Sequence, residues 1–123
     1  MADSKLLDST TWVDYLIKKT HTEIIDSEEK LFLSVLSIFE IKKKLIKDKL
    51  PKEDIKKSIK FLKEKSIILP VTEKIAERAA EIANEKDMPM ADSIIYVTSL
   101  FNNSKLLTLD NDFRGLENVE ILD

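Results

Sequence analysis

The chain has 123 residues, of which 43% are hydrophobic and 35% charged, and this length and composition predict a single folded domain over residues 1–123. It contains no cysteine, which excludes disulfides, thiolate zinc sites and cysteine nucleophiles, and its one histidine, His21, argues against histidine-rich metal sites and serine–histidine nucleophiles. The formal net charge is -3, and no apolar run approaches the roughly 18 residues of a membrane span, so we expect a cytoplasmic protein without a membrane partner.

The chain begins with an apolar strand that ends in an acid. Residues 5–8 predict this strand, and residues 10–19 predict the helix after it, with Ser9 or Thr10 as the N-terminal cap. Asp8 closes the strand directly before that helix. Taken alone, an acid in this place is explained as well by a turn or a helix cap as by a metal site.

A second strand and helix follow a polar stretch. Residues 22–30 predict a short helix or loop, and residues 31–35 predict the second strand. Ser37 and Glu40 have the spacing of a capping box that opens the next helix. That helix is expected to end just before Pro51, because proline disfavours a helical conformation in the residue before it. The side chains expected to face the core from it are Ile38, Phe39, Ile41 and Leu45.

The rest of the chain continues the alternation of helices and strands. The expected elements are a helix beginning at residues 51–53, a strand over 66–71, a helix over 72–87, a helix over 90–101 and strands over 105–109 and 119–122. Thr72 is expected to cap its helix, and Asn102 or Asn103 to supply the left-handed residue after residue 101. Strands that alternate with helices predict βαβ units and therefore an α/β fold with a parallel sheet.

Carboxylates recur at one predicted edge of this sheet. The four that follow strands or open helices are Asp8, Glu40, Asp92 and Asp110. Each has an ordinary explanation by itself, as a cap, a capping-box residue, a first-turn acid or a turn residue. Together they lie at the edge where parallel α/β folds bind ligands, and crowded carboxylates repel one another unless a cation lies between them. Because only oxygen ligands are at hand, Mg²⁺ or Mn²⁺ suits such a site.

Four short motifs occur in order along the chain. They read KLLDSTTWVDYL at residues 5–16, SVLSIFEI at residues 34–41, ADSII at residues 91–95 and LTLDNDF at residues 107–113. In sequence, order and overall length they resemble the PIN domain family, and its VapC-type toxins in particular. The resemblance implies a PIN-like three-layer α/β/α fold, with a central parallel sheet of four to five strands flanked by helices. It also implies a metal-dependent endoribonuclease.

The same resemblance implies roles for individual residues. The catalytic and metal-binding carboxylates would be Asp8, Glu40, Asp92 and Asp110. Asp112 would be a peripheral metal ligand. The hydroxyls of Ser9 or Thr10, and of Thr108, would support the carboxylates by hydrogen bonding.

Cofactor and partners follow from the resemblance as well. The cofactor would be Mg²⁺ or Mn²⁺, and the substrate would be RNA. The family suggests a homodimer that an antitoxin protein inhibits, so the chain would be the toxin of a type II toxin–antitoxin pair. Two other functions stay open, a housekeeping PIN nuclease of RNA maturation and a non-catalytic module that binds RNA or protein. A dinucleotide-binding fold and a P-loop are disfavoured, because each needs a glycine-rich turn and the chain has one glycine, Gly115.

Residues 42–65 carry much of the positive charge. This stretch has eleven lysines and four acids, a local balance of +7, so the remainder of the chain carries -10. Such a stretch beside an acidic site is explained equally well as a track for RNA and as a solvated face. The lysines proposed to contact RNA are Lys43, Lys47, Lys57 and Lys60.

Overall fold

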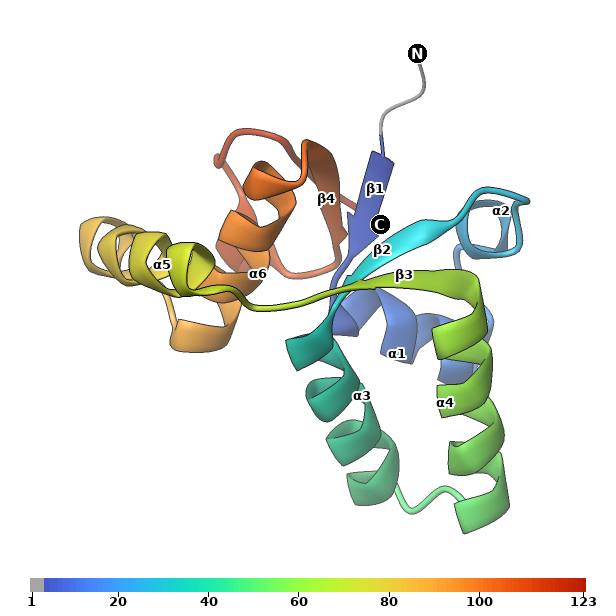
Figure 1. Cartoon of the computed structure of the whole chain (residues 1–123). Helices are drawn as coiled ribbons and strands as arrows, with labels where there is room; N and C mark the ends of the chain where they lie inside the picture. The colour runs from blue at the N-terminus through green and yellow to red at the C-terminus, as the bar shows by residue number, and fades with distance from the viewer. Residues whose placement is uncertain (1–3) are drawn as a thin grey trace.

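The structure is a computed structural model that describes residues 4–123, and it contains a parallel sheet with helices on both faces (Figure 1). The strands are β1 Ser4–Leu7, β2 Leu31–Ser34, β3 Ser66–Leu69, β4 Ser104–Thr108 and β5 Val119–Ile121. They lie in the order β3-β2-β1-β4-β5, and all four neighbouring pairs are parallel. The predicted three-layer α/β fold with a parallel sheet is therefore confirmed.

Two apolar clusters fill the space between the sheet and its helices. The helices are α1 Ser9–Lys18, α2 Thr22–Ile25, α3 Val35–Lys47, α4 Lys52–Lys65, α5 Glu73–Lys86, α6 Met90–Phe101 and the short 3-10 helix η1 Asn111–Phe113. In β1, Leu7 packs in the cluster with α1, α3 and α4, whereas Leu6 packs in the cluster with α5 and α6. Successive strand side chains point to opposite faces, so this central strand is buried on both sides.

The order of the strands places the ends of β1 and β4 side by side. The chain runs from β1 outward to β2 and β3, and then returns to add β4 and β5 on the other side of β1. Leu6 pairs with Leu106 and Leu7 pairs with Leu107, so both strands end at the same level. In open parallel sheets the crevice at such a reversal, beyond the carboxyl ends of the strands, is the usual ligand site.

Two helices start earlier than the sequence suggested. The α1 helix is capped by Asp8, whose side chain accepts a hydrogen bond from the Thr11 amide, and not by Ser9 or Thr10. The α3 helix begins directly after β2 and is capped by Ser34, so the predicted capping box from Ser37 is wrong. Every serine near a strand end can cap a helix. Which one does so depends on where the strand stops pairing with its neighbour.

Phe39 corrects the predicted core face of α3. Ile41 and Leu45 are buried and Ile38 packs against them, as expected, but the Phe39 side chain is 63% exposed. Neighbouring residues on a helix point about 100° apart, so the face that buries these aliphatic residues turns Phe39 outward. A large aromatic side chain therefore stands in solvent directly before Glu40.

The remaining elements follow the sequence closely. Thr72 caps α5 by accepting a hydrogen bond from the Ile75 amide, and Asn103 adopts the left-handed conformation after α6, with a φ of 49°. The nearly all-round apolar α6 is buried along most of its length. Within residues 4–123, none of the helices combines the length and the apolar character needed to cross a membrane.

Candidate metal centre

Asp8 is held tightly where β1 meets β4. Its Oδ1 atom accepts hydrogen bonds from the Thr10 hydroxyl at 2.7 Å and from the amide and hydroxyl of Thr11, both at 3.2 Å. Its Oδ2 atom accepts one from the Thr108 hydroxyl at 2.5 Å. Burial raises the pKa of Asp8, and these hydrogen bonds oppose that shift. Since the cap of α1 uses only Oδ1, Oδ2 keeps acceptor capacity for a cation.

The Thr108 side chain connects two of the predicted metal ligands. Its hydroxyl donates to Asp8 and accepts a hydrogen bond from the Asp110 amide at 2.9 Å. Thr10 adds a second link, because its hydroxyl donates to Asp8 and accepts from the Leu109 amide at 3.2 Å. The orientation of the Asp8 carboxylate is thus coupled to the backbone that carries Asp110.

Glu40 reaches the same edge of the sheet from the second turn of α3. Burial raises its pKa, a hydrogen bond with the Ser9 side chain lowers it, the charge of Asp8 raises it and the charge of Lys43 lowers it. Because α3 starts at Val35, Glu40 has no part in a capping box. A capping box therefore does not explain the acid at position 40.

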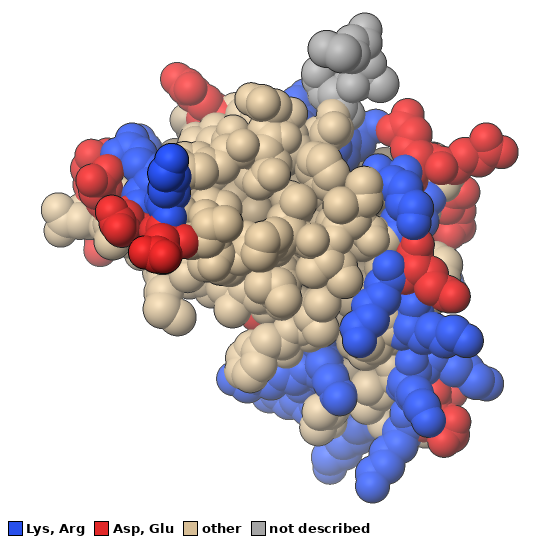
Figure 2. All heavy atoms as spheres, viewed as in Figure 1, with Lys and Arg blue, Asp and Glu red and all other residues tan. Residues whose placement is uncertain are grey.

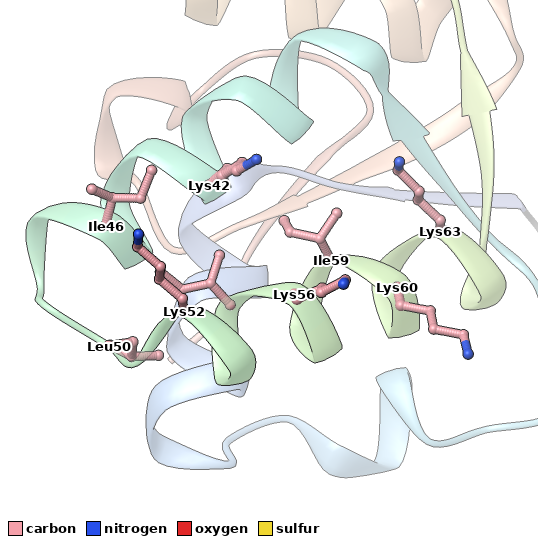
Figure 3. Close-up of a pocket in the computed structure, with 9 residues that line it drawn as sticks. Lys42, Ile46, Leu50, Lys52, Lys56, Ile59, Lys60 and Lys63 are labelled. Carbon is pink, nitrogen blue, oxygen red and sulfur yellow. The ribbon is translucent and has the colours of Figure 1, made fainter.

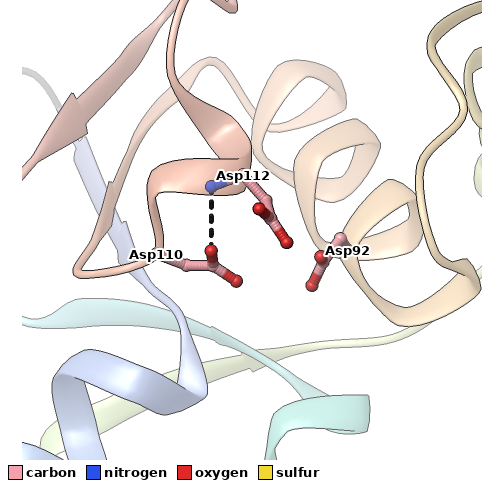
Figure 4. A group of neighbouring side chains, drawn as sticks. All are labelled: Asp92, Asp110 and Asp112. Carbon is pink, nitrogen blue, oxygen red and sulfur yellow. Dashed lines mark hydrogen bonds between the residues drawn. The ribbon is translucent and has the colours of Figure 1, made fainter.

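Asp92, Asp110 and Asp112 converge on one point (Figure 4). Asp92 lies in the first turn of α6, Asp110 follows β4, and Asp112 lies in η1. Each offers a carboxylate oxygen, and these oxygens lie within 4.8 Å of one another. Asp110 Oδ1 also accepts a hydrogen bond from the Asp112 amide at 2.8 Å. Asp112, which the sequence placed at the periphery, belongs to this group by distance although its side chain is exposed.

Asp92 and the four other carboxylates are called the acidic site below, and the charges of those four act on Asp92. Burial and then the charges of the four other acids raise the pKa of Asp92 to about 6. Mutual repulsion of this kind is relieved by a bound cation. The donors are all hard oxygen atoms, and the single histidine, His21, lies at the start of α2 instead. This donor set fits Mg²⁺ or Mn²⁺.

Thr11 is one residue of the site that sequence reasoning missed. Its amide and hydroxyl both donate to Asp8, and the hydroxyl also lies 3.3 Å from the Leu107 carbonyl oxygen. The signal was present, since Thr11 stands three residues after Asp8, the spacing at which a cap accepts from a helix amide. The prediction that Ser9 or Thr10 caps the helix gave the Thr11 amide no bond to Asp8.

Thr108→Val is expected to weaken Mn²⁺ affinity about 10- to 100-fold, the usual effect of removing a hydrogen-bond partner from a metal ligand. Valine keeps the shape of threonine but cannot donate to Asp8 Oδ2, so the pKa of Asp8 rises further. Calorimetric titration with Mn²⁺ measures the change. Thr98→Val is the matched control, because Thr98 is also fully buried and donates only within α6, to the Ile94 carbonyl oxygen. Unchanged affinity in Thr108→Val would contradict the supporting role.

The predicted RNA-contacting lysines do not all line one hollow. Lysines crowd over α3 and α4 in Figure 2, and a groove of about 900 Å³ lies between these helices (Figure 3). Lys60 lines that groove, and Lys43 lines a smaller hollow of about 350 Å³ beside α3. Lys47 and Lys57 line neither of the two. The apolar floor of the groove is formed by Ile46, Leu50, Ile55 and Ile59.

Comparison with known proteins gives one family match and several similar structures. The family model described as PIN domain matches residues 5–119. A toxin–antitoxin complex from Klebsiella pneumoniae contains a chain with 19% identity and a TM-score of 0.80, and the match covers 95% of this chain and 96% of that one. DNA-bound VapBC from Salmonella typhimurium gives 15% identity and a TM-score of 0.81, and the match covers 99% of this chain and 98% of that one. VapC20 from Mycobacterium tuberculosis, a Sarcin-Ricin loop cleaving toxin, gives 15% identity and a TM-score of 0.76, and the match covers 98% of this chain and 100% of that one. No curated protein matches the chain.

Proposed function

Because the chain belongs to the PIN domain family, we propose that it is a metal-dependent endoribonuclease that hydrolyses RNA phosphodiester bonds, and the toxin of a type II toxin–antitoxin pair. The observation that carries the proposal is the acidic site, in which the carboxylates of Asp92, Asp110 and Asp112 converge and the charges of Asp8 and Glu40 act on Asp92. The similar structures from toxin–antitoxin complexes favour the toxin over the housekeeping nuclease. A neighbouring open reading frame for a small antitoxin would support this choice, and its absence would contradict it.

In the proposed mechanism the carboxylates of the acidic site bind the metal, and nearby hydroxyls orient one of these carboxylates. Asp8, Glu40, Asp92 and Asp110 would hold Mg²⁺ or Mn²⁺, with Asp112 as a peripheral ligand. When bound, the metal supplies positive charge for the scissile phosphate and lowers the pKa of a water molecule. No side-chain nucleophile is needed. The threonine hydroxyls keep the Asp8 carboxylate in one orientation, so that little reorganisation is required on binding.

Metal-dependent cleavage is the direct test of this function. Purified protein is expected to cut RNA, to stop when EDTA is added and to regain activity with excess Mn²⁺. Because a carboxylate must be ionised to bind the metal, and the pKa of Asp92 is about 6 in the free protein, Mn²⁺ affinity is expected to fall below about pH 6. Cleavage that persists in EDTA would refute the metal mechanism. RNA binding without cleavage under any metal would favour the non-catalytic module.

The groove between α3 and α4 is the proposed site for an antitoxin. Its floor is aliphatic, and its rim carries lysines from both helices, which suits an amphipathic segment with acidic side chains (Figure 3). The rim is formed by Lys42, Lys52, Lys56, Lys60 and Lys63. These lysines then have a role that does not involve RNA.

We also propose a homodimer. Figure 2 shows a broad face without charged side chains, and β3 crosses this face in the same view in Figure 1. Ile67 and Ile68 on this edge strand are 45% and 36% exposed. Exposed apolar residues on an edge strand are a common site for a second copy of a chain. Light scattering of the purified protein tests this, and a monomeric mass at micromolar concentration would refute it.

A further inference from the structure

Phe39 is an exposed aromatic side chain beside the acidic site. It lies on α3 directly before Glu40, and 63% of it is open to solvent. Burying a phenylalanine stabilises a fold by roughly 1.5–3 kcal/mol, so the fold gains little from this one. Among residues 4–123, the Phe39 ring belongs to neither apolar cluster and does not line the groove between α3 and α4.

Lys43 interacts with both this ring and Glu40. Its Nζ atom is 5.8 Å from the centroid of the Phe39 ring, in cation–π geometry, and its charge acts on the carboxylate of Glu40. The acidic site repels an RNA backbone, so a substrate that approaches it needs a cation nearby. Lys43 provides one, next to an aromatic ring.

The surface around the pair has room for a flat ligand. Phe39 and Lys43 line the hollow of about 350 Å³ on α3, together with Ile38, Lys42 and Ile46. The ammonium group lies over the ring, and the high exposure of Phe39 leaves ring surface free to stack on a planar ligand. An aromatic ring with lysines beside it is the combination that binds unpaired nucleotides, with the base on the ring and the phosphate at the cation.

We propose that Phe39 and Lys43 form a nucleotide subsite, in which Phe39 stacks on an unpaired base of the RNA and Lys43 contacts an adjacent phosphate. The inference rests on the proposed ribonuclease function and adds two residues outside the acidic site that hold an unpaired nucleotide. Bases within a duplex are already stacked and cannot reach the ring. The larger groove is a poorer candidate for this subsite, because no aromatic side chain lines it.

Affinity for a short oligoadenylate, measured with Ca²⁺ in place of Mg²⁺ to prevent turnover, tests the stacking. Phe39→Leu keeps an apolar side chain of good helix propensity but removes the aromatic face. We expect it to bind at least about fivefold more weakly, because base stacking on an aromatic residue is worth roughly 5- to 150-fold in affinity. Phe39→Trp is expected to bind as tightly as the wild type or more tightly.

A spectroscopic signal separates stacking from a merely structural role. In Phe39→Trp the new indole is expected to lose fluorescence when oligoadenylate binds. The only tryptophan of the natural chain, Trp12, is fully buried and provides a constant background. Binding without quenching would overturn the proposed stacking.

A salt titration tests the phosphate contact. Lys43→Gln is expected to reduce the slope of log affinity against log salt by about 0.7, the value for one phosphate contact with a single strand. Lys74→Gln is the matched control, because Lys74 is also an exposed helical lysine but lies on α5 and outside the hollow. It is expected to leave the slope unchanged. Equal slopes in Lys43→Gln and the wild type would refute the contact.

The outcomes distinguish this inference from the function on which it rests. If wild-type protein neither binds nor cuts RNA, the proposed function fails. If the wild type binds oligoadenylate and Phe39→Leu binds equally well, only the subsite fails. If Phe39→Leu instead changes the mass in solution while RNA affinity stays constant, the ring belongs to a protein interface and the subsite is refuted.

Discussion

Asp92→Asn is expected to abolish cleavage, lowering kcat about 100-fold or more, because a bound metal contributes several kcal/mol to phosphodiester hydrolysis. Asp92 lies at the point where Asp110 and Asp112 converge, so removing its charge takes one carboxylate from the centre of the group (Figure 4). Single-turnover cleavage in saturating Mn²⁺ measures the loss. Cleavage at the wild-type rate would show that Asp92 is not a ligand.

The same substitution is expected to stabilise the metal-free fold. The pKa of Asp92 rises from 3.8 to about 6 on folding, so the ionised carboxylate costs stability above about pH 6. Protonation relieves that cost as the pH falls through 6 toward 4. The gain of Asp92→Asn in thermal midpoint in EDTA should therefore be largest at pH 7 to 8 and vanish near pH 4. A lower midpoint than the wild type at pH 8 would contradict the repulsion.

Asp54→Asn is the matched control for both measurements. Asp54 also lies in the first turn of a helix, α4, where it interacts favourably with the helix dipole. It is exposed and lies outside the acidic site. If Asp92 served only the dipole, the two variants would behave alike, each with a small loss of stability and normal cleavage.

Asp110→Asn is expected to lower the cleavage rate about 100-fold or more. Asp112→Asn is expected to lower it less. Asp110 is half-buried and its amide is bound to Thr108, so its position is fixed, whereas the Asp112 side chain is exposed. Asparagine keeps an oxygen that accepts the Asp112 amide, so the turn survives and only the charge is lost. Cleavage rates at several Mn²⁺ concentrations measure both variants.

Two outcomes would contradict the expectation that Asp110 matters more than Asp112. Their carboxylate oxygens lie equally within the 4.8 Å group, so distance alone does not rank them. Equal losses in the two variants would mean that Asp112 binds the metal directly. A larger loss in Asp112→Asn would reverse the assignment. Mn²⁺ affinity measured in parallel separates weaker metal binding from slower chemistry.

Local sequence was sufficient for the elements of this fold. The apolar run before Asp8, the cap at Thr72 and the left-handed Asn103 were all predictable, because each depends on a few neighbouring residues. The start of α3 was not. Ser34 and Ser37 have similar capping chemistry, and only the pairing of β2 with β1 and β3 decides where the strand ends. The exposure of Phe39 follows from that helix start and the face it buries.

The sequence by itself determined that the chain alternates strands and helices, and it favoured oxygen ligands for any metal site, since the chain has no cysteine and one histidine. It could not determine which strands lie side by side, because any of several orders buries the same apolar runs. Tertiary structure decided this by placing β4 next to β1. Asp8 and Thr108, one hundred positions apart, thereby come within hydrogen-bond distance. The arrangement of the acidic site depends on this order, since no local pattern fixes a distance between residues so far apart in the chain.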